Sequence, residues 1–424
     1  MLILITGATG FIGRRLTAAL RTAGHRVIAA SRHPVGNDAV AADFTRDFDS
    51  EAWVPKLAGV DVVINAVGII RQKGAQTFEN IHARAPKALF SACVKAGVKK
   101  VIQISALGAD QGTTRYFTTK HDADEYLARL PIAWTIVQPS LVFGFGGTSA
   151  SLFTLLASLP VTPLPGGGAQ QVQPIHVDDV VAAVLELIES TEMNGKRVAL
   201  VGPEPVSLKE FLRRLRQRMQ LPRSWFVTIP SFVMRATANV AQYIPGSLLD
   251  PETLCMLEAG NTAPPDDTHR LLRRSPRPPE LLIGDDHRDV MRREAQLAWL
   301  LPLLRISIAL VWIWTGIVSL GLYPIEDSYD LLARVGIGAS LAPLMLYGAA
   351  VLDLLVGLAT LVMSRLGWLW LLQLAVILGY SVIITFKLPE FWLHPYGPLS
   401  KNVVMLAAIY VLYTLEPRRW NTSS

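Results

Sequence analysis

The feature that most constrains this chain is a tail made of long apolar blocks. Residues 300–323 and 341–363 each contain one charged side chain, Arg305 and Asp353 respectively, and residues 366–386 contain none. A helix needs about 20 apolar residues to cross a hydrocarbon core about 30 Å thick. Several such stretches in one tail argue against buried helices of a soluble core, so we predict membrane-spanning helices.

A fourth apolar stretch, residues 402–415, is shorter than the others. At a rise of about 1.5 Å per residue it would form a helix about 21 Å long, which is short for a span. Lys401 and Arg418 flank this stretch and could snorkel to the two interfaces. We therefore predict a four-helix transmembrane bundle in which the last helix is the shortest.

The basic residues outside these stretches predict the orientation of the bundle. With four crossings, one side of the membrane holds Arg288, Arg292, Arg293, Arg365, Arg418 and Arg419, and the other holds Arg334, Lys387 and Lys401. Basic loops favour the cytoplasmic face. The first residues lack the apolar region and cleavage site of a signal peptide. We therefore expect a multi-pass protein of the cell (inner) membrane, with the lipid bilayer as partner and a cytoplasmic N-terminal domain.

Composition excludes several classes of protein. Of the 424 residues 51% are hydrophobic and 17% are charged, which excludes a disordered chain. The net charge of +6 suits an anionic leaflet, and the chain has no basic stripe with interleaved aromatics that would predict nucleic-acid binding. We interpret the arginines within 213–218 as a solvated helix face. Two cysteines, Cys93 and Cys255, are too few for a disulfide framework or a zinc site, so we expect no metal.

Up to about residue 140, short β-like runs alternate with amphipathic helical segments. The runs are 2–5, 27–30, 62–65, 101–104 and 135–138, and the helical segments are 11–23, 77–96 and 117–129. This alternation is typical of an α/β fold with a doubly wound parallel sheet. We predict a Rossmann domain over 1–204, a small α-rich substrate or accessory lobe with a linker over 205–290, and a transmembrane domain over 291–424. Prolines and charges in 264–279 predict a surface loop or hinge.

The first β-like run leads into a glycine-rich turn and then a helix. Its residues are Gly7, Thr9, Gly10, Phe11, Ile12 and Gly13, within the sequence TGATGFIG. The first glycine permits a tight turn, the second lets the backbone approach a pyrophosphate, and the third lets the helix pack on the strand. The helix N-terminus then presents free N–H groups to the phosphates. The turn predicts a dinucleotide-binding site.

Residues at the ends of the next strands extend this predicted site. Arg32 follows the second strand, where an acid would hold the ribose of NAD and an arginine suits the 2′-phosphate of NADP. We therefore expect NADP(H) in preference to NAD(H), with a solvent-exposed loop arginine as the alternative interpretation. Asp43 could contact the adenine or be a simple loop acid. Asn65, Ala66 and Gly68 end a further strand, and their small size would let the cofactor lie across the sheet edge.

Ser105, Tyr116 and Lys120 form a candidate catalytic set. Ser105 follows a strand, and Tyr116 and Lys120 are spaced i, i+4, which places them on one helix face. A nearby lysine favours tyrosinate, which would bring the tyrosine pKa down toward a useful range. Tyr116 would move a proton to or from a substrate oxygen held by Ser105, while the nicotinamide moves hydride. A Tyr-x-x-x-Lys spacing also arises by chance, but here it follows a phosphate turn.

Residues 1–200 resemble the extended and atypical short-chain dehydrogenases/reductases. The matching phrases, in order, are TGATGFIG, NAVG, ISALGA, YFTTK, QPSLVFG and QPIHVDD. The phrase from Pro139 to Gly144 most resembles the branch that contains the Rossmann-type accessory subunit of respiratory complex I. The resemblance implies a doubly wound sheet, NADPH binding at the turn and along Pro139, and a Ser/Tyr/Lys set. It also implies that some members keep the cofactor as a structural element.

The tail from about 299 to 420 resembles the DoxX-like membrane family. The matching phrases are RISIALVWIWTG, DLLVG and HPYGPLSKN, with Asp353 where the family leads us to expect Glu. A carboxylate within a membrane helix should face the bundle interior and find a partner. Arg305 could reach Asp353; alternatively, Arg305 snorkels and Asp353 is protonated. We interpret His394, in the outer loop, as structural.

Three functions remain open from the sequence. The first is an NADP(H)-dependent oxidoreductase that acts on a small, apolar or quinone-like substrate at the inner face of the membrane. The second is a non-catalytic NADPH-binding scaffold, assembly factor or sensor of a membrane protein complex. The third is an epimerase or dehydratase acting on a nucleotide-linked sugar, for which the sequence shows no recognisable sugar-nucleotide pocket.

Overall fold

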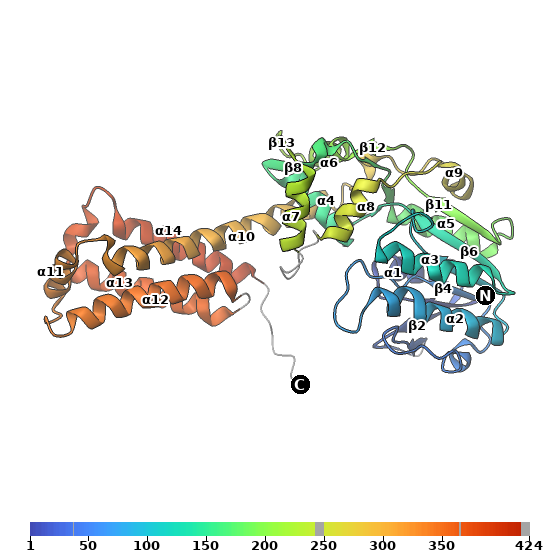
Figure 1. Cartoon of the computed structure of the whole chain (residues 1–424), viewed down its shortest axis with the longest axis horizontal. Helices are drawn as coiled ribbons and strands as arrows, with labels where there is room; N and C mark the ends of the chain where they lie inside the picture. The colour runs from blue at the N-terminus through green and yellow to red at the C-terminus, as the bar shows by residue number, and fades with distance from the viewer. Residues whose placement is uncertain (37, 242–249, 364–365, 417–424) are drawn as a thin grey trace. The chain divides into compact units, whose positions relative to one another are not determined.

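The computed structural model describes residues 1–36, 38–241, 250–363 and 366–416 (Figure 1). The chain divides into two compact units, Met1–Ala295 and Gln296–Ser424. Arg365, Arg418 and Arg419, on which the predicted orientation partly rests, lie outside the described residues.

The first unit is built on a seven-stranded parallel sheet. Its strands are β1 (Leu2–Thr6), β2 (Arg26–Ser31), β3 (Ala39–Ala41), β4 (Val62–Asn65), β5 (Lys100–Ile104), β6 (Ala133–Pro139) and β11 (Lys196–Leu200). They lie in the order β11-β6-β5-β4-β1-β2-β3. The order reverses between β1 and β4, which is the switch point where α/β folds bind ligands. The predicted doubly wound parallel sheet is confirmed.

Helices cover both faces of this sheet. They are α1 (Phe11–Thr22), α2 (Ala85–Lys95), α3 (Arg115–Ala128) and α5 (Val177–Glu189), with one π-helical turn, η2 (Glu79–Arg84), before α2. One core joins the sheet to α1 and α5 and includes Leu16, Leu20 and Leu187, all fully buried. A second core joins it to α2 and α3 and includes Phe90 and Leu127. The amphipathic patterns therefore correspond to two separate buried layers.

A smaller lobe packs around a third core at one end of this unit. Its elements are β7 (Val142–Phe143), α4 (Thr148–Ser158), β8 (Val161–Pro165), η3 (Gly166–Gly168), β9 (Gln171–Val172), β10 (Ile175–His176), β12 (Val206–Ser207), α6 (Leu208–Arg218), β13 (Trp225–Ile229), α7 (Ser231–Ala241), α8 (Pro251–Ala259) and η4 (Pro279–Leu281). Two further short helices, η1 (Val54–Leu57) and α9 (Asp266–Leu272), pack in the second and first cores of the sheet instead. Phe143, Phe153 and Phe211 meet edge to face in the core of the lobe.

Two local predictions for residues 205–290 are wrong. The segment 264–279 is not only loop, because it contains α9, whose Thr268 and Leu271 are buried. Arg216 is not on a solvated face either, since it is 7% exposed. Its guanidinium donates to the carbonyls of Ala157 and Leu159 at 2.6 and 2.7 Å. The sequence periodicity of α6 identified the apolar face of the helix. It did not show that Arg216 would be buried against the C-terminal end of α4.

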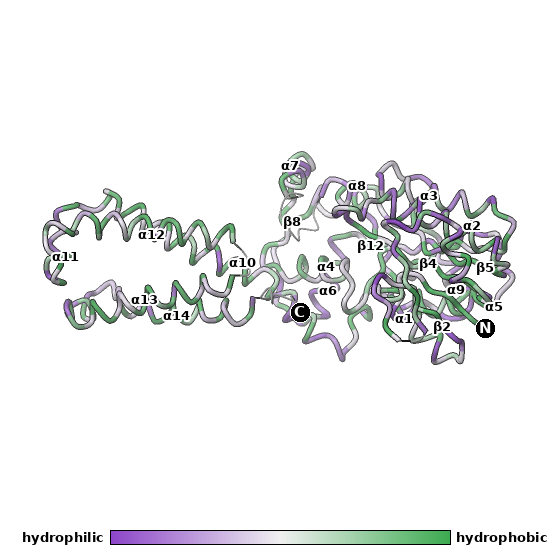
Figure 2. Tube along the Cα trace, turned by 90° about the horizontal axis from the view of Figure 1, so that it is seen from below, coloured by the Kyte–Doolittle hydropathy of each residue, from purple (hydrophilic) through white to green (hydrophobic). Residues whose placement is uncertain are grey.

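Among the residues that the structure describes, four helices are long and apolar enough to cross a membrane, and all of them lie wholly or largely in the second unit. They are α10 (Arg288–Ile317, continued by η5, Val318–Leu322), α12 (Ala342–Val362), α13 (Gly367–Lys387) and α14 (Pro398–Leu415), with α11 (Ile325–Val335) and η6 (Pro389–Trp392) between them. Figure 2 shows hydrophobic residues along all four. The last helix has 18 residues, and is therefore about 27 Å long rather than the predicted 21 Å. The predicted four-helix assignment is confirmed.

Polar side chains inside this second unit bear on the first of the two alternatives that the sequence left open, a pair between Arg305 and Asp353. Arg305 does not pair with Asp353. It forms an ion pair with Glu416 at 3.2 Å and donates to the carbonyls of Thr360 and Met363. Asp353 is 6% exposed, and its Oδ1 has no hydrogen-bond partner among the described residues. The Arg305 guanidinium therefore binds carbonyl groups at the C-terminal end of α12, whereas the Asp353 carboxylate is buried in the packed interior.

A double-mutant cycle tests this pairing in the full-length chain. Arg305→Met and Glu416→Gln each remove one member of a pair that is 14% and 13% exposed. Each change should destabilise the protein by about 3–5 kcal/mol, because it leaves a charge buried alone. The two effects should not add, which thermal unfolding in detergent measures. The matched cycle of Arg305→Met with Asp353→Asn should be additive; coupling there instead would contradict the observed pairing.

Candidate active site

The phosphate turn lies at the switch point, between the end of β1 and the start of α1. Gly7 has φ +70°, and a Cβ there would lie 2.8 Å from the carbonyl oxygen of Ala66. A Cβ at Gly13 would lie 2.1 Å from the carbonyl oxygen of Gly7. Gly10 occupies the N-cap of α1, and no described side chain caps the helix there. Its free N–H groups and the space left by the glycines fit a pyrophosphate.

Behind the turn, buried amides tie together the carboxyl ends of three strands. Asn65 is fully buried, accepts from the hydroxyl of Thr6 at 2.6 Å and donates to Gln103 at 2.7 Å. The backbone of the predicted Asn65-Ala66-Val67-Gly68 strand end therefore lies at the turn, while the Asn65 side chain is used within the sheet. Its satisfied amide fixes the spacing of the strands beneath the turn.

The two residues predicted to select the cofactor lie beyond β2 and β3. Arg32 is exposed directly after β2, where its side chain is free to meet a 2′-phosphate. Asp43 accepts from the N–H and hydroxyl of Thr45. Partial burial opposes ionisation of Asp43, but the bonds from Thr45 and the charges of Arg46 and Arg32 outweigh it and lower its pKa. The Asp43 carboxylate is thus occupied by its own turn.

Ser105 and Lys120 are both buried at the carboxyl end of β5. The Ser105 hydroxyl donates to the carboxylate of Asp124, and Lys120 Nζ donates to the carbonyl of Ile104 at 3.2 Å. Burial lowers the pKa of Lys120 to about 8, partly offset by Asp124. Burial also raises the pKa of Asp124 to about 6, against the effects of Ser105 and Lys120. An acid and a base therefore titrate near neutrality beside the predicted serine.

Tyr116 lies half-buried on the same helix, α3, with Lys120 Nζ 5.7 Å from the centre of its ring. Burial, followed by the charge of Asp124, raises the pKa of Tyr116 to about 12. The expectation that the lysine brings this pKa down is wrong here, because desolvation outweighs a cation that lies over the ring. The phenol is thus protonated at neutral pH.

Two residues of this site escaped sequence reasoning. Asp124 is one helical turn beyond Lys120, and its i, i+4 spacing was a signal that could have found it. His82 lies on η2, accepts from the N–H of Ile69 at 3.1 Å and meets the ring of Tyr116 edge to face. Burial, followed by the charge of Lys120, lowers the His82 pKa well below its usual range. A Cβ on Gly68 would lie 3.6 Å from Lys120 Nζ and 3.8 Å from His82 Nε2, so Gly68 lies beside both of these side chains.

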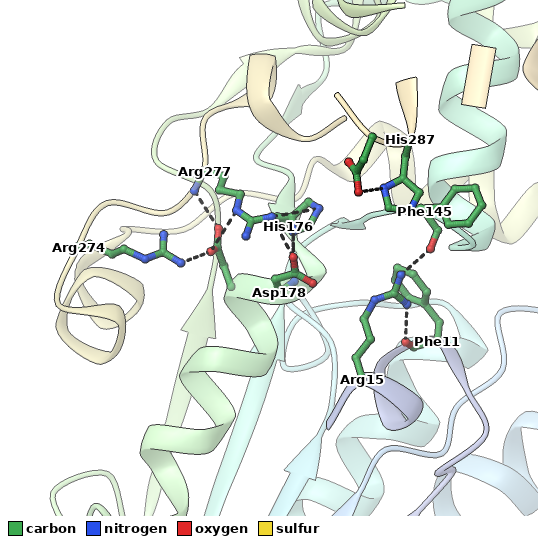
Figure 3. A network of polar contacts seen from close by, with 10 residues as sticks. Phe11, Arg15, Phe145, His176, Asp178, Arg274, Arg277 and His287 are labelled. Atoms are coloured by element: carbon green, nitrogen blue, oxygen red, sulfur yellow. Dashed lines mark hydrogen bonds and ion pairs between the residues drawn. The ribbon is translucent and has the colours of Figure 1, made fainter. Parts of the chain in front are cut away.

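A polar network borders the phosphate turn on the side of α5 (Figure 3). Arg15, on α1, donates to the carbonyls of Phe11 and Phe145 at 3.0 and 2.6 Å. The Phe145 ring contacts His287, with centroids 4.5 Å apart. A cavity of about 270 Å³ lies beside this network. It is lined by Arg15, Phe145, His176, Asp178, Arg277, Leu282, Gly284, Asp286, His287 and Met291. The network fixes the first turns of α1, and hence the orientation of the phosphate turn.

Comparison with protein families agrees with both halves of this description. Residues 7–187 match the NAD(P)H-binding family, and residues 309–410 match the DoxX-like family. Ceramide reductase of Caulobacter vibrioides is 28% identical over 217 residues, which are 50% of this chain and 68% of that protein. The Arabidopsis thaliana mitochondrial NADH dehydrogenase [ubiquinone] 1 alpha subcomplex subunit 9 is 29% identical over 253 residues, 55% of this chain and 61% of that protein. The chain thus spans 68% and 61% of the lengths of these two curated relatives.

Solved structures show the same fold. A human epimerase family protein with NADPH has a TM-score of 0.53 at 20% identity, covering 70% of this chain and 99% of that one. The NADPH-dependent quinone oxidoreductase of Escherichia coli, also with NADPH, has a TM-score of 0.54 at 19% identity, covering 66% and 98%. Residues 7–187 are therefore similar to the NAD(P)H-binding family and have a Rossmann fold, and residues 309–410 are similar to the DoxX-like family.

Proposed function

We propose that this protein is an NADP(H)-dependent oxidoreductase that reduces a carbonyl of an apolar, lipid-like or quinone-like substrate at the cytoplasmic face of the cell membrane. The observation that carries this proposal is the placement of Tyr116. Its phenol is protonated, and it shares a helix with the buried Lys120, whose Nζ lies 5.7 Å from the centre of the Tyr116 ring. Lys120 Nζ also donates to the carbonyl of Ile104 at the carboxyl end of β5, and folds of this kind bind their cofactor at the carboxyl ends of the strands.

The residues of the site divide the chemistry among themselves. Bound NADPH would supply a hydride to the carbonyl carbon of the substrate. Tyr116 would donate its proton to the carbonyl oxygen, which becomes a hydroxyl. The cationic form of Lys120 would stabilise the phenolate that remains until a proton from solvent replaces the one transferred. Ser105 donates its single proton to Asp124, so its oxygen can accept a hydrogen bond from the product hydroxyl but cannot donate one to the carbonyl oxygen.

An apolar substrate is supported by two independent features. A DoxX-like membrane domain in the same chain tethers the NAD(P)H-binding domain to the bilayer in which such a molecule would dissolve. In addition, one relative is named a ceramide reductase, and one protein of similar fold is named a quinone oxidoreductase. The test is a spectrophotometric assay of NADPH oxidation by the full-length protein in lipid nanodiscs, offered long-chain lipid ketones and quinones. Oxidation that depends on one substrate class supports the proposal; none with any class, by protein that binds NADPH, overturns it.

A second function, a non-catalytic NADPH-binding scaffold of a membrane complex, is favoured by one specific observation. The Ser105 hydroxyl donates its hydrogen bond to the buried Asp124, and this bond can have a purely structural role. The Arabidopsis relative is named as a subunit of NADH dehydrogenase. A scaffold would bind NADPH without consuming it under every condition of the same assay. Epimerase or dehydratase activity stays third, because no side chain of the site identifies a sugar nucleotide.

The proposed preference for NADPH depends on Arg32. Arg32→Ala should weaken binding of NADPH about tenfold, since it removes a charge-assisted bond to the 2′-phosphate, and should leave NADH binding unchanged. Fluorescence titration of both nucleotides into the full-length protein in detergent measures this. Arg46→Ala is the control, because Arg46 is an exposed arginine paired with Asp43. Equal losses for NADPH and NADH would show that Arg32 does not read the 2′-phosphate.

A further inference from the structure

A group of large apolar side chains is exposed along β8, β13 and α7 of the first unit. We call it the β13–α7 surface. Its members, with their exposed fractions, are Val161 (53%), Trp225 (78%), Val227 (42%), Phe232 (75%), Val233 (38%) and Val240 (67%). β8 and β13 pair in parallel along their whole length, and Pro230 alone separates β13 from α7. Figure 1 shows α7 beside this two-stranded ribbon. Val161 and Trp225 are directly paired across these two strands, and α7 follows β13 after one residue.

Helix α7 is poorly covered by the rest of the protein. Among its described side chains Ala238 alone is buried, and Met234 is half-buried. The helix has 11 residues, and isolated helices shorter than about 12–15 residues are marginal in water. Large exposed aromatic and β-branched side chains add to the cost of leaving it in solvent. A partner that accepts this apolar face would stabilise the helix.

The β13–α7 surface begins close to the helix that leaves for the membrane. The backbone N–H of Trp225 donates to the carbonyl of Pro160 at 3.0 Å. Ser158, two residues earlier, donates to the carbonyl of Ala295 in α10 at 3.1 Å. Arg216 holds these segments together, since it donates both to Leu159 and to Pro222. The edge that presents Trp225 is thus fixed to α10 near residue 295.

The chain from Ala295 to the apolar block is short and helical. Helix α10 is continuous over Arg288–Ile317, and the apolar block begins at Leu300. Five residues of helix span about 7.5 Å. The headgroup layer of one leaflet is itself roughly 5–8 Å thick, the difference between hydrocarbon and total thickness shared by two leaflets. The edge bearing Trp225 is therefore tethered by only a few residues to the segment where the apolar block begins.

From this arrangement we propose that the β13–α7 surface inserts into the headgroup region of the bilayer that the protein spans, as an interfacial anchor separate from the transmembrane helices. Tryptophan and phenylalanine prefer the boundary between headgroups and acyl chains. Arg223 is exposed at the same edge and has no ion pair within the described part of the chain, so it is available to a lipid phosphate. Insertion of this surface would hold the lobe against the lipid.

The experiment uses full-length protein in nanodiscs of zwitterionic and anionic phospholipids. Exposed Cys255 is first replaced by serine, while buried Cys93 is kept. An environment-sensitive fluorophore is then attached at Phe232→Cys or Val240→Cys, two positions whose wild-type side chains contribute little to the core. Val35→Cys, at a residue 89% exposed in the sheet region, is the matched control. Gel filtration and NADPH titration establish that each labelled protein is folded.

Labels at 232 and 240 should shift their emission to the blue, and lipids with a nitroxide near the headgroup should quench them. The label at 35 should show neither effect. Arg223→Gln should reduce the quenching more in anionic than in zwitterionic discs. An aqueous emission spectrum at both positions would overturn the proposal. A blue shift without quenching by the nitroxide lipids would also overturn it, since it would mean that protein, such as a second copy of the chain, covers the surface.

Discussion

Replacing Tyr116 with phenylalanine is expected to lower turnover of the reducible substrate by about 100- to 10,000-fold, the usual contribution of a positioned general acid. The ring contacts of Tyr116 with Phe78, His82 and Phe117 should survive, because they involve the ring alone. NADPH affinity and thermal stability should therefore stay close to those of the wild type. The measurement is the steady-state rate of NADPH oxidation in nanodiscs, with NADPH affinity determined in parallel.

The matched control is Tyr126→Phe on the same helix. The Tyr126 hydroxyl lies 2.6 Å from the hydroxyl of Ser91, in the interface between α2 and α3 and outside the site. Its loss should affect stability slightly and turnover little. If Tyr116→Phe turns over substrate as fast as this control, Tyr116 is not the proton donor. The protein would then use another acid, for which Lys120 and Asp124 are the titrating candidates.

Replacing Gly13 with valine should remove cofactor binding and destabilise the first unit by roughly 3 kcal/mol or more, as overpacking against a rigid element does. A Cβ at this position would lie 2.1 Å from the carbonyl oxygen of Gly7 and 2.8 Å from its carbonyl carbon. These are backbone atoms of the phosphate turn, so relief requires α1 to move away from β1. The measurement is thermal unfolding of the full-length protein with and without NADPH.

Ala18→Val, on the exposed side of the same helix, is the matched control. It adds a β-branched side chain to α1 without a contact at the turn, and should cost well under 1 kcal/mol. NADPH should stabilise this control as it does the wild type and should not stabilise Gly13→Val. A Gly13→Val protein that binds NADPH normally would show that the turn does not hold the pyrophosphate.

The elements of the first unit follow from the sequence because their signals are local. The runs at 2–5, 62–65 and 101–104 are apolar enough to be buried on both faces, and the observed strands match them closely. The glycine spacing around Gly7 to Gly13 identifies a strand–turn–helix unit without reference to distant residues. Edge strand β11 was missed, since its residues Lys196–Leu200 are only partly buried and give a weaker pattern.

Side-chain partnerships required the tertiary structure. The sequence placed Ser105 with Tyr116 and Lys120, but only the packing of α3 on β5 showed that Asp124 takes the serine hydroxyl. The sequence predicted that Lys120 would lower the pKa of Tyr116. In the structure, burial raises this pKa instead.

The same division holds in the membrane domain. The length of each apolar block determined by itself that four helices can cross a bilayer, because crossing depends on the number of consecutive apolar residues. Which charged side chains meet inside the bundle depends on the rotation of each helix about its axis and on its position along that axis. The sequence of a single helix does not determine either quantity. Arg305 therefore met Glu416 rather than Asp353. Local patterns set what each segment becomes; contacts between segments distant in sequence decide what its polar groups can do.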